Sequence, residues 1–297
     1  MIRSNRITAI LQAIFVTILW ATSWVLIKIG LHDNLPALTF AGLRYGLSFV
    51  CLVPFVFLNQ NNRNVISSLS YAAWGRLALL GVIFYTLTQG SQFLSLVYLP
   101  AATVSLILGL TPVLVGAAGM GFLGEKPTIG QWLGIAMTIF GVGLYFLPTG
   151  FSNIQTIGLL IAVVGVVSNA AGSILGRNVN RDLTIPPVVI TFVSMGVGAF
   201  LLLLIGGLIQ GFGSLNIQSW LLIAWLAVVN TAFAFTLWNL TLQTLTAVES
   251  SVINSLIMPQ IAILAFVFLG EALNLQEVAG LILVGIGALV VQLKHQG

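Results

Sequence analysis

The hydrophobic pattern of the chain is a series of long apolar runs separated by short polar segments. Each run holds about 20 residues, which is the length that crosses a bilayer as a helix. The runs lack the alternation of half-buried strands, and a lipid-exposed helix satisfies its own backbone whereas an open sheet edge does not. They fall at about 7–30, 36–58, 74–97, 100–123, 129–147, 155–177, 186–209, 218–243, 247–269 and 275–293. We therefore predict an all-α polytopic membrane protein with ten transmembrane helices and an interfacial loop at 59–70.

Composition agrees with a membrane protein and excludes a soluble one. Of 297 residues, 59% are hydrophobic and 5% are charged, and the mean hydropathy is +1.11. A soluble domain carries about 25% charged residues, so this chain lacks the polar surface to coat a water-soluble globule. The net charge of +4 does not indicate a nucleic-acid partner, because in a membrane protein basic residues are interpreted by the loop that holds them.

The basic residues gather on one side of the predicted membrane. With the N-terminus in the cytoplasm, the cytoplasmic loops and span edges hold Arg3, Arg6, Arg63, Arg76, Lys126, Arg177, Arg181 and Lys294. The loops on the opposite side hold no lysine or arginine, and only Lys28 and Arg44 lie inside spans. The positive-inside rule then predicts that both termini are cytoplasmic. We expect Lys28, which lies near the outer interface, to extend its amine toward water.

Two stretches of the chain repeat one pattern at an offset of 146 residues. Residues 101–125 and 247–271 share an internal proline and the ending Leu-Gly-Glu, and the glycines of the next span recur at the same offset. We predict two five-helix repeats, 1–148 and 149–297. Because each repeat has an odd number of spans, the second is expected to be inverted in the membrane. Inverted repeats are typical of transporters that alternate access to a midplane site.

The repeated segment "LPAATVSLILGLTPVLVGAAGMGFLGEKPTIGQWLGIAMTIFGVGL" and its second copy resemble the EamA family of the drug/metabolite transporter superfamily. The segment "LWATSWVLIKIG…LPALTFAGLRYGLSFV" resembles the first two helices of that family, including an arginine in the second span, here Arg44. The resemblance extends over essentially the whole chain. It implies a ten-helix exporter of small metabolites, amino acids first, in the bacterial inner membrane, and we expect a monomer.

Polar and aromatic residues within the spans predict a substrate site. Tyr85, Gln89 and Gln92 lie on one face of the third span, and comparable residues occur in the first, fourth, sixth, eighth and ninth spans. Aromatic walls with a few hydrogen-bonding groups suit a small, partly apolar solute. The alternatives are hydrogen bonds between helices and, for tryptophan, anchoring at the interface. The predicted substrate-binding residues are Trp20, Ser23, Trp24, Tyr85, Gln89, Gln92, Ser105, Asn169, Asn230, Trp238, Asn239 and Asn254.

Four further residues are candidates for coupling or gating. Glu249 lies about one turn inside the ninth span, where an acid either carries a coupling proton or interacts with the helix dipole. Arg44 lies deep in the second span and either binds a substrate carboxylate, has a structural or gating role, or extends outward. Pro112 and Pro259 each remove a helix hydrogen bond, which produces a hinge or a static bend.

Motifs of other function classes are missing from the sequence. No HExxH, G-x-S-x-G or P-loop pattern occurs, and the two histidines, His32 and His295, lie in a loop and in the tail. We therefore expect no enzyme activity, cofactor, metal site or ATP-driven pumping by this chain. The alternatives that stay open are an uncoupled facilitator of other metabolites, an enzyme acting on lipid intermediates within the membrane, and a structural or sensor subunit.

Overall fold

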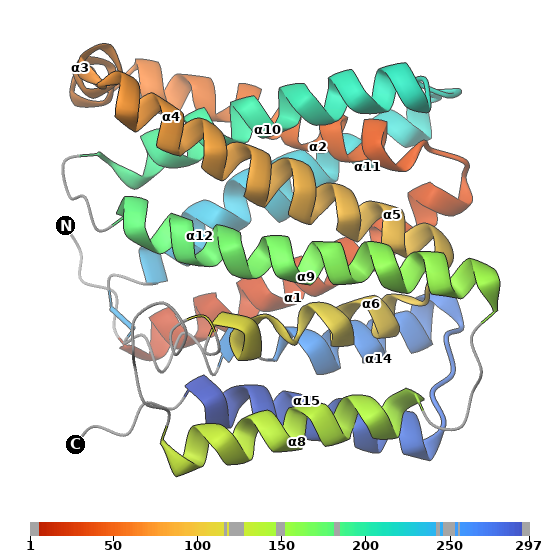
Figure 1. Cartoon of the computed structure of the whole chain (residues 1–297). Coiled ribbons are helices and arrows are strands. Elements are labelled where there is room, and N and C mark those ends of the chain that lie inside the picture. The colour runs from red at the N-terminus through yellow and green to blue at the C-terminus, as the bar shows by residue number, and fades with distance from the viewer. Residues whose placement is uncertain are drawn as a thin grey trace.

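The protein is a bundle of long helices, and in the computed structural model no described residue forms a strand (Figure 1). The structure describes residues 6–115, 118, 128–146, 152–180, 185–241, 244–245, 253–254 and 256–292. The helices of the first half are α1 (Arg6–His32), α2 (Ala37–Phe57), α3 (Gln60–Ser68), α4 (Tyr71–Leu80), η1 (Gly81–Gln89), α5 (Gly90–Tyr98), α6 (Ala101–Leu108) and α8 (Ile129–Phe146). Those of the second half are α9 (Asn153–Asn180), α10 (Pro187–Ile209), α11 (Ile217–Ala227), η2 (Val228–Phe233), α12 (Ala234–Thr241), α14 (Ile257–Leu269) and α15 (Leu275–Gln292).

Seven segments of the described chain are long and apolar enough to cross a membrane. They are Arg6–His32, Ala37–Phe57, Tyr71–Tyr98, Ile129–Phe146, Asn153–Gly176, Pro187–Ile209 and Ile217–Trp238. Where the other three spans are predicted, the structure has shorter apolar helices, at Ala101–Val115, Ile257–Leu269 and Leu275–Val290. By length and composition, seven helical segments of the described chain therefore qualify as membrane spans. The total of ten spans stays a prediction.

The segment predicted as an interfacial loop, 59–70, contains helix α3, so that prediction is wrong. The side chain of Asn59 caps the helix by accepting hydrogen bonds from the backbone nitrogens of Asn61, at 2.9 Å, and Asn62, at 3.4 Å. Asn62 is buried and donates through Nδ2 to the carbonyl of Phe55. A side-chain cap satisfies N–H groups that a helix otherwise leaves open, so a polar segment forms a short helix here.

Helices α8 and α15 pack against each other at one edge of the bundle, with their backbones almost in contact (Figure 1). A Cβ atom added to Gly141 would lie 2.9 Å from the carbonyl oxygen of Gly280, and one added to Gly287 would lie 2.7 Å from that of Gly134. The pairing of 134 with 287 and of 141 with 280 shows that the two helices run antiparallel. Small residues permit such close approach between helices in membranes.

The third and eighth segments each contain a π-helical stretch between two α-helices, η1 in the first half and η2 in the second. In η1 the hydroxyl of Thr88 donates to the carbonyl of Ile83 at 3.0 Å, and in η2 that of Thr231 donates to Leu226 at 2.8 Å. Both bonds reach back five residues. Such widened turns are rare in proteins, and those that occur often lie at functional sites.

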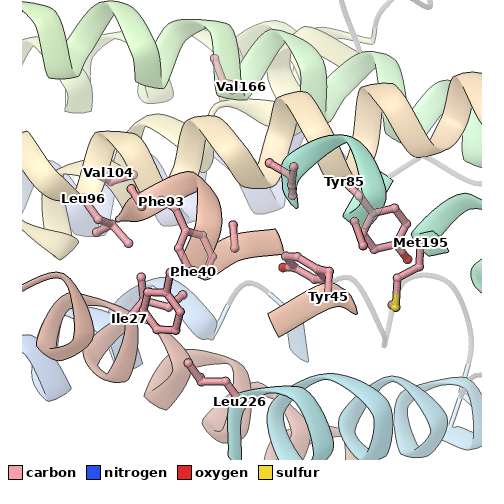
Figure 2. Packing of buried hydrophobic residues seen from close by; sticks show 14 of the residues in the cluster. Ile27, Phe40, Tyr45, Tyr85, Phe93, Leu96, Val104, Val166, Met195 and Leu226 are labelled. Atoms are coloured by element: carbon pink, nitrogen blue, oxygen red, sulfur yellow. The ribbon is translucent and has the colours of Figure 1, made fainter. Parts of the chain in front are cut away.

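The apolar core lies where α1, α2, η1, α5, α10 and α11 meet (Figure 2). Phe40 and Phe93 pack edge to face with ring centroids 5.2 Å apart, and Tyr45 and Tyr85 do so at 5.5 Å. Large apolar side chains are also exposed on the outer faces of the bundle, among them Phe140 and Phe266. Exposed apolar surface of this extent fits contact with lipid rather than with water.

Candidate substrate cavity

A cavity of about 790 Å³ lies between α1, α2, η1, α5, α6, α9, α12, α14 and α15. Its volume is in the range of sites for small organic ligands. Many of the residues predicted for substrate binding or gating line it, although they come from both halves of the chain. These residues are Trp20, Ser23, Trp24, Arg44, Gln89, Gln92, Ser105, Pro112, Asn169, Trp238 and Asn254. The structure therefore brings together in one cavity residues that the sequence places on seven of the ten predicted spans.

An aromatic cluster forms one wall of the cavity. The ring of Trp20 on α1 lies 5.2 Å from the rings of both Phe235 and Trp238 on α12, with tilted geometry in both pairs. The indole nitrogen of Trp20 is buried and has no hydrogen-bond partner among the described residues. This wall presents flat apolar surface to a solute.

The polar groups of the cavity differ in whether the protein already uses them. Asn169 donates through Nδ2 to the hydroxyl of Thr111 at 2.9 Å, and Ser105 and Ser23 donate to carbonyls within their own helices. The side-chain amides of Gln89 and Gln92 make no hydrogen bond to another described residue. Those two amides are therefore available to a solute.

Arg44 lies in the wall of the cavity and is only 4% exposed. Its Nε donates to the hydroxyl of Thr231 in η2 at 3.0 Å, and its guanidinium carbon lies 5.2 Å from the ring centroid of Tyr45. From the sequence we expected Arg44 to contact the substrate, to have a structural or gating role, or to extend outward. Burial in the cavity wall contradicts extension outward, and the other two roles remain predictions.

The prolines of the repeat lie where helices break or begin. Pro112 lines the cavity just beyond the end of α6, and it lacks the N–H that would donate to the carbonyl of Leu108. The hydroxyl of Thr111 donates to that carbonyl at 2.7 Å instead. Pro259 lies in the first turn of α14, where helix N–H groups have no intrahelical partner, and it is not among the residues that line the cavity.

Two predicted binding residues are not among those that line the cavity. Tyr85 is buried and packs edge to face on Tyr45, as Figure 2 shows. Asn230 is fully buried, and its Nδ2 donates to the carbonyl of Leu19 and to the hydroxyl of Thr22. Asn230 therefore forms the hydrogen bond between helices that the sequence left open as an alternative.

Two further predicted residues cannot be placed in the same way. Glu249 lies outside the described residues. Asn239 belongs to α12, and its side chain is outside the described part of the chain. The coupling role of Glu249 and the binding role of Asn239 therefore stay predictions.

The structure also adds residues that sequence reasoning missed. Phe84, Thr88, Thr111, Phe235 and Met258 line the cavity, but apolar and hydroxyl side chains in a span are common and carry no distinct signal. For Thr111 the signal was available, because it directly precedes Pro112 and can replace the hydrogen bond that the proline removes.

Lys28 does not extend its amine toward water as predicted. It is 9% exposed, and its Nζ donates to the carbonyls of Leu96 and Leu99, each at 2.6 Å. Just beyond, the carboxylate of Glu271 accepts hydrogen bonds from the backbone nitrogen of Ala101 at 2.9 and 3.0 Å. Carbonyls at a helix C-terminus attract a cation, and N–H groups at a helix N-terminus attract an anion. Lys28 therefore connects α1 to the end of α5, and Glu271 connects the end of α14 to the start of α6.

The chain belongs to the EamA-like transporter family, because the family profile matches residues 7–147 and again residues 156–293. It is thus a membrane protein of a transporter family, as its sequence predicted. The uncharacterised transporter YvbV of Bacillus subtilis (strain 168) is 28% identical over 291 residues, which is 97% of this chain and 92% of that protein. A probable amino-acid metabolite efflux pump of Escherichia coli (strain K12) is 28% identical over 178 residues, 59% of this chain and 56% of the pump.

A solved crystal structure has the same fold. It superposes with a TM-score of 0.67 over 97% of this chain and 98% of the other chain, at 18% sequence identity. The bacterial relatives imply an inner-membrane location.

Proposed function

We propose that this protein is a secondary transporter of the bacterial inner membrane that exports small organic metabolites, amino acids first, by alternating access. The cavity of about 790 Å³ carries this proposal. It lies in a helix bundle of a transporter family and combines an aromatic wall with the amides of Gln89 and Gln92, which make no hydrogen bond to another described residue. Such a combination suits a solute that has both apolar and polar parts. We propose no catalytic activity for the chain.

Packing between the two halves supports an inverted repeat, which the alternating-access mechanism uses. At the offset of 146, Gly134 corresponds to Gly280 and Gly141 to Gly287. The contact between 141 and 280 therefore has its counterpart in the contact between 287 and 134. Reciprocal contacts between antiparallel helices are what a two-fold axis in the membrane plane would produce.

The π-helical stretches support the same symmetry. Each lies in the third helical segment of its half of the chain, and each carries a threonine that donates to a carbonyl five residues earlier. Residues of η1 line the cavity directly, namely Phe84, Thr88 and Gln89. η2 is connected to it through Thr231, whose hydroxyl accepts a hydrogen bond from Nε of Arg44. A widened turn at the equivalent position of each half is what two copies of one fold would produce.

Two relatives support amino acids as the first substrates to test. The E. coli protein and its counterpart in Salmonella typhimurium, which is 26% identical over 178 residues, are both named probable amino-acid metabolite efflux pumps. Glu249 is the residue we propose for proton coupling, on the sequence argument alone. If Glu249→Gln leaves the pH dependence of transport unchanged, that coupling role is refuted and an uncoupled facilitator is favoured.

The test is counterflow of a radiolabelled amino-acid panel into proteoliposomes that contain the purified full chain. We expect at least one solute to exchange, and we expect Trp238→Ala to weaken exchange because it removes part of the aromatic wall. Trp132→Ala is the matched control, since Trp132 is 56% exposed on the outside of α8. Absence of counterflow for every solute by a well-folded protein would refute the proposal.

A further inference from the structure

We propose that Arg44 binds the carboxylate of the transported solute, so that the cavity takes small organic carboxylates with an apolar or aromatic body. This inference rests on the proposed transport function and specifies the class of substrate. The observation behind it is that Arg44 is a buried cation and that most of its N–H donors have no hydrogen-bond partner among the described residues. Arg44 is 4% exposed, and the one hydrogen bond that its side chain makes to a described residue comes from Nε.

The terminal nitrogens of Arg44 are left for a ligand. A guanidinium group has five N–H donors, of which four are on the two Nη atoms. Neither Nη atom has a hydrogen-bond partner among the described residues, although Arg44 lines the cavity. An unpaired cation at membrane depth is expensive, and it is typically compensated by an anion or marks a functional site. A solute carboxylate would supply that anion and accept two parallel N–H bonds.

The position of the guanidinium group is set by η2. The widened turn of η2 lets the hydroxyl of Thr231 donate to the carbonyl of Leu226 at 2.8 Å. That bond directs the hydroxyl oxygen so that it accepts from Nε of Arg44 at 3.0 Å. The guanidinium carbon also lies over the ring of Tyr45, 5.2 Å from its centroid. Thr231 is thus a positioning residue that holds one edge of the guanidinium and leaves the Nη edge open.

The remaining lining defines the rest of the solute. Among the described residues that line the cavity, Arg44 is the single charged side chain. A phosphate group carries about two negative charges at neutral pH, and no cation other than Arg44 is among the described residues that line the cavity. One arginine matches one carboxylate. The rings of Trp20, Phe235 and Trp238 offer flat apolar surface to the solute body.

A thermal-stability assay on the purified full chain in lipid nanodiscs tests the inference. The probes are L-phenylalanine, L-leucine and 3-phenylpropionate, each compared with its own amide, which has nearly the same shape but lacks the negative charge of the carboxylate. We expect at least one carboxylate to raise the unfolding midpoint and its amide not to. Loss of a bidentate charged contact should weaken binding by about tenfold to a hundredfold, so Arg44→Gln should lose this stabilisation.

Three further variants separate binding from folding. Arg44→Lys keeps the charge but loses the planar fork, so its affinity should fall between those of the wild type and Arg44→Gln. Thr231→Val should reduce the preference for carboxylate over amide. Its elution volume in size-exclusion chromatography should match that of the wild type, which shows that the variant is folded. Arg63→Gln is the matched control, because Arg63 is exposed on α3, and it should bind as the wild type does.

Several outcomes would overturn the inference. It fails if no carboxylate stabilises the protein, if amides stabilise it equally, or if Arg44→Gln keeps wild-type affinity. If Arg44→Gln does not fold, the wild-type comparison of acid with amide and the Arg44→Lys variant decide the question. Counterflow of a solute without a carboxylate, unchanged in Arg44→Gln, would refute the role of Arg44 while leaving the transport function intact.

Discussion

Adding one methyl group between α8 and α15 should destabilise the bundle, because the two backbones leave no room for it. In Gly280→Ala the new Cβ would lie 2.8 Å from the carbonyl oxygen of Gly141 and 2.8 Å from the backbone nitrogen of Tyr145. Backbone atoms cannot rotate away as a side chain can. The helices must therefore separate by several tenths of an ångström along a contact that also includes Gly287.

The expected magnitude follows from two opposing effects. Overpacking of a close contact costs about 1–3 kcal/mol, while replacing glycine by alanine within a helix gains about 0.5–1 kcal/mol. Gly280→Ala should therefore lower the free energy of unfolding by about 1–2 kcal/mol. Gly143→Ala is the matched control on α8, because a Cβ there would meet no atom within 4 Å, and it should be neutral or slightly stabilising.

The measurement is unfolding of the purified protein in mixed micelles as the proportion of denaturing detergent is raised. The free energy of unfolding of each variant is compared with that of the wild type. The close-packing argument predicts that Gly280→Ala unfolds at a lower detergent fraction than Gly143→Ala. Equal stability of the two variants would show that α8 and α15 do not pack as described, and the reasoning would be refuted.

Two other outcomes are expected. Glu271→Gln should lower the free energy of unfolding by about 1–2 kcal/mol in the same assay, because it weakens the charged cap on the backbone nitrogen of Ala101; an unchanged value would contradict a capping role. In a Cys51→Ser background, an impermeant maleimide applied to intact cells should label Ser214→Cys and leave Ser67→Cys unlabelled, because the charge pattern places residue 214 outside and residue 67 in the cytoplasm. The reverse labelling would show that the predicted orientation is inverted.

The candidate site was predictable to the extent that it depends on which residues lie in spans. Polar groups are costly in lipid, so Gln89 and Gln92 in a long apolar run had to face a cavity or another helix, and they line the cavity. Tyr85 was assigned to the same face by α-helical spacing, but it lies in η1, where the turns are wider. A four-residue step there is not one turn, so Tyr85 packs on Tyr45 instead.

The hydrogen-bond partners of a charged residue within a span could not be predicted from the sequence. Lys28 was expected to reach for water, yet it donates to the carbonyls of Leu96 and Leu99. Its depth in the span could be estimated from the chain alone. Its partners could not, because they belong to a helix end about seventy residues later, which only the packing of α1 against α5 brings near.

The sequence by itself determined the class of protein, its long apolar segments and the duplication of its motifs. These properties depend on local composition and on comparison of one stretch with another, and both are readable along the chain. Tertiary structure decided which polar side chains face the cavity and which are used between helices. Asn230 is the clearest case: its Nδ2 donates to Leu19 and Thr22, whereas the Nη atoms of Arg44 make no hydrogen bond to a described residue. The physical reason is that a buried polar group bonds to whatever lies beside it in space, and those neighbours come from helices far away in the chain.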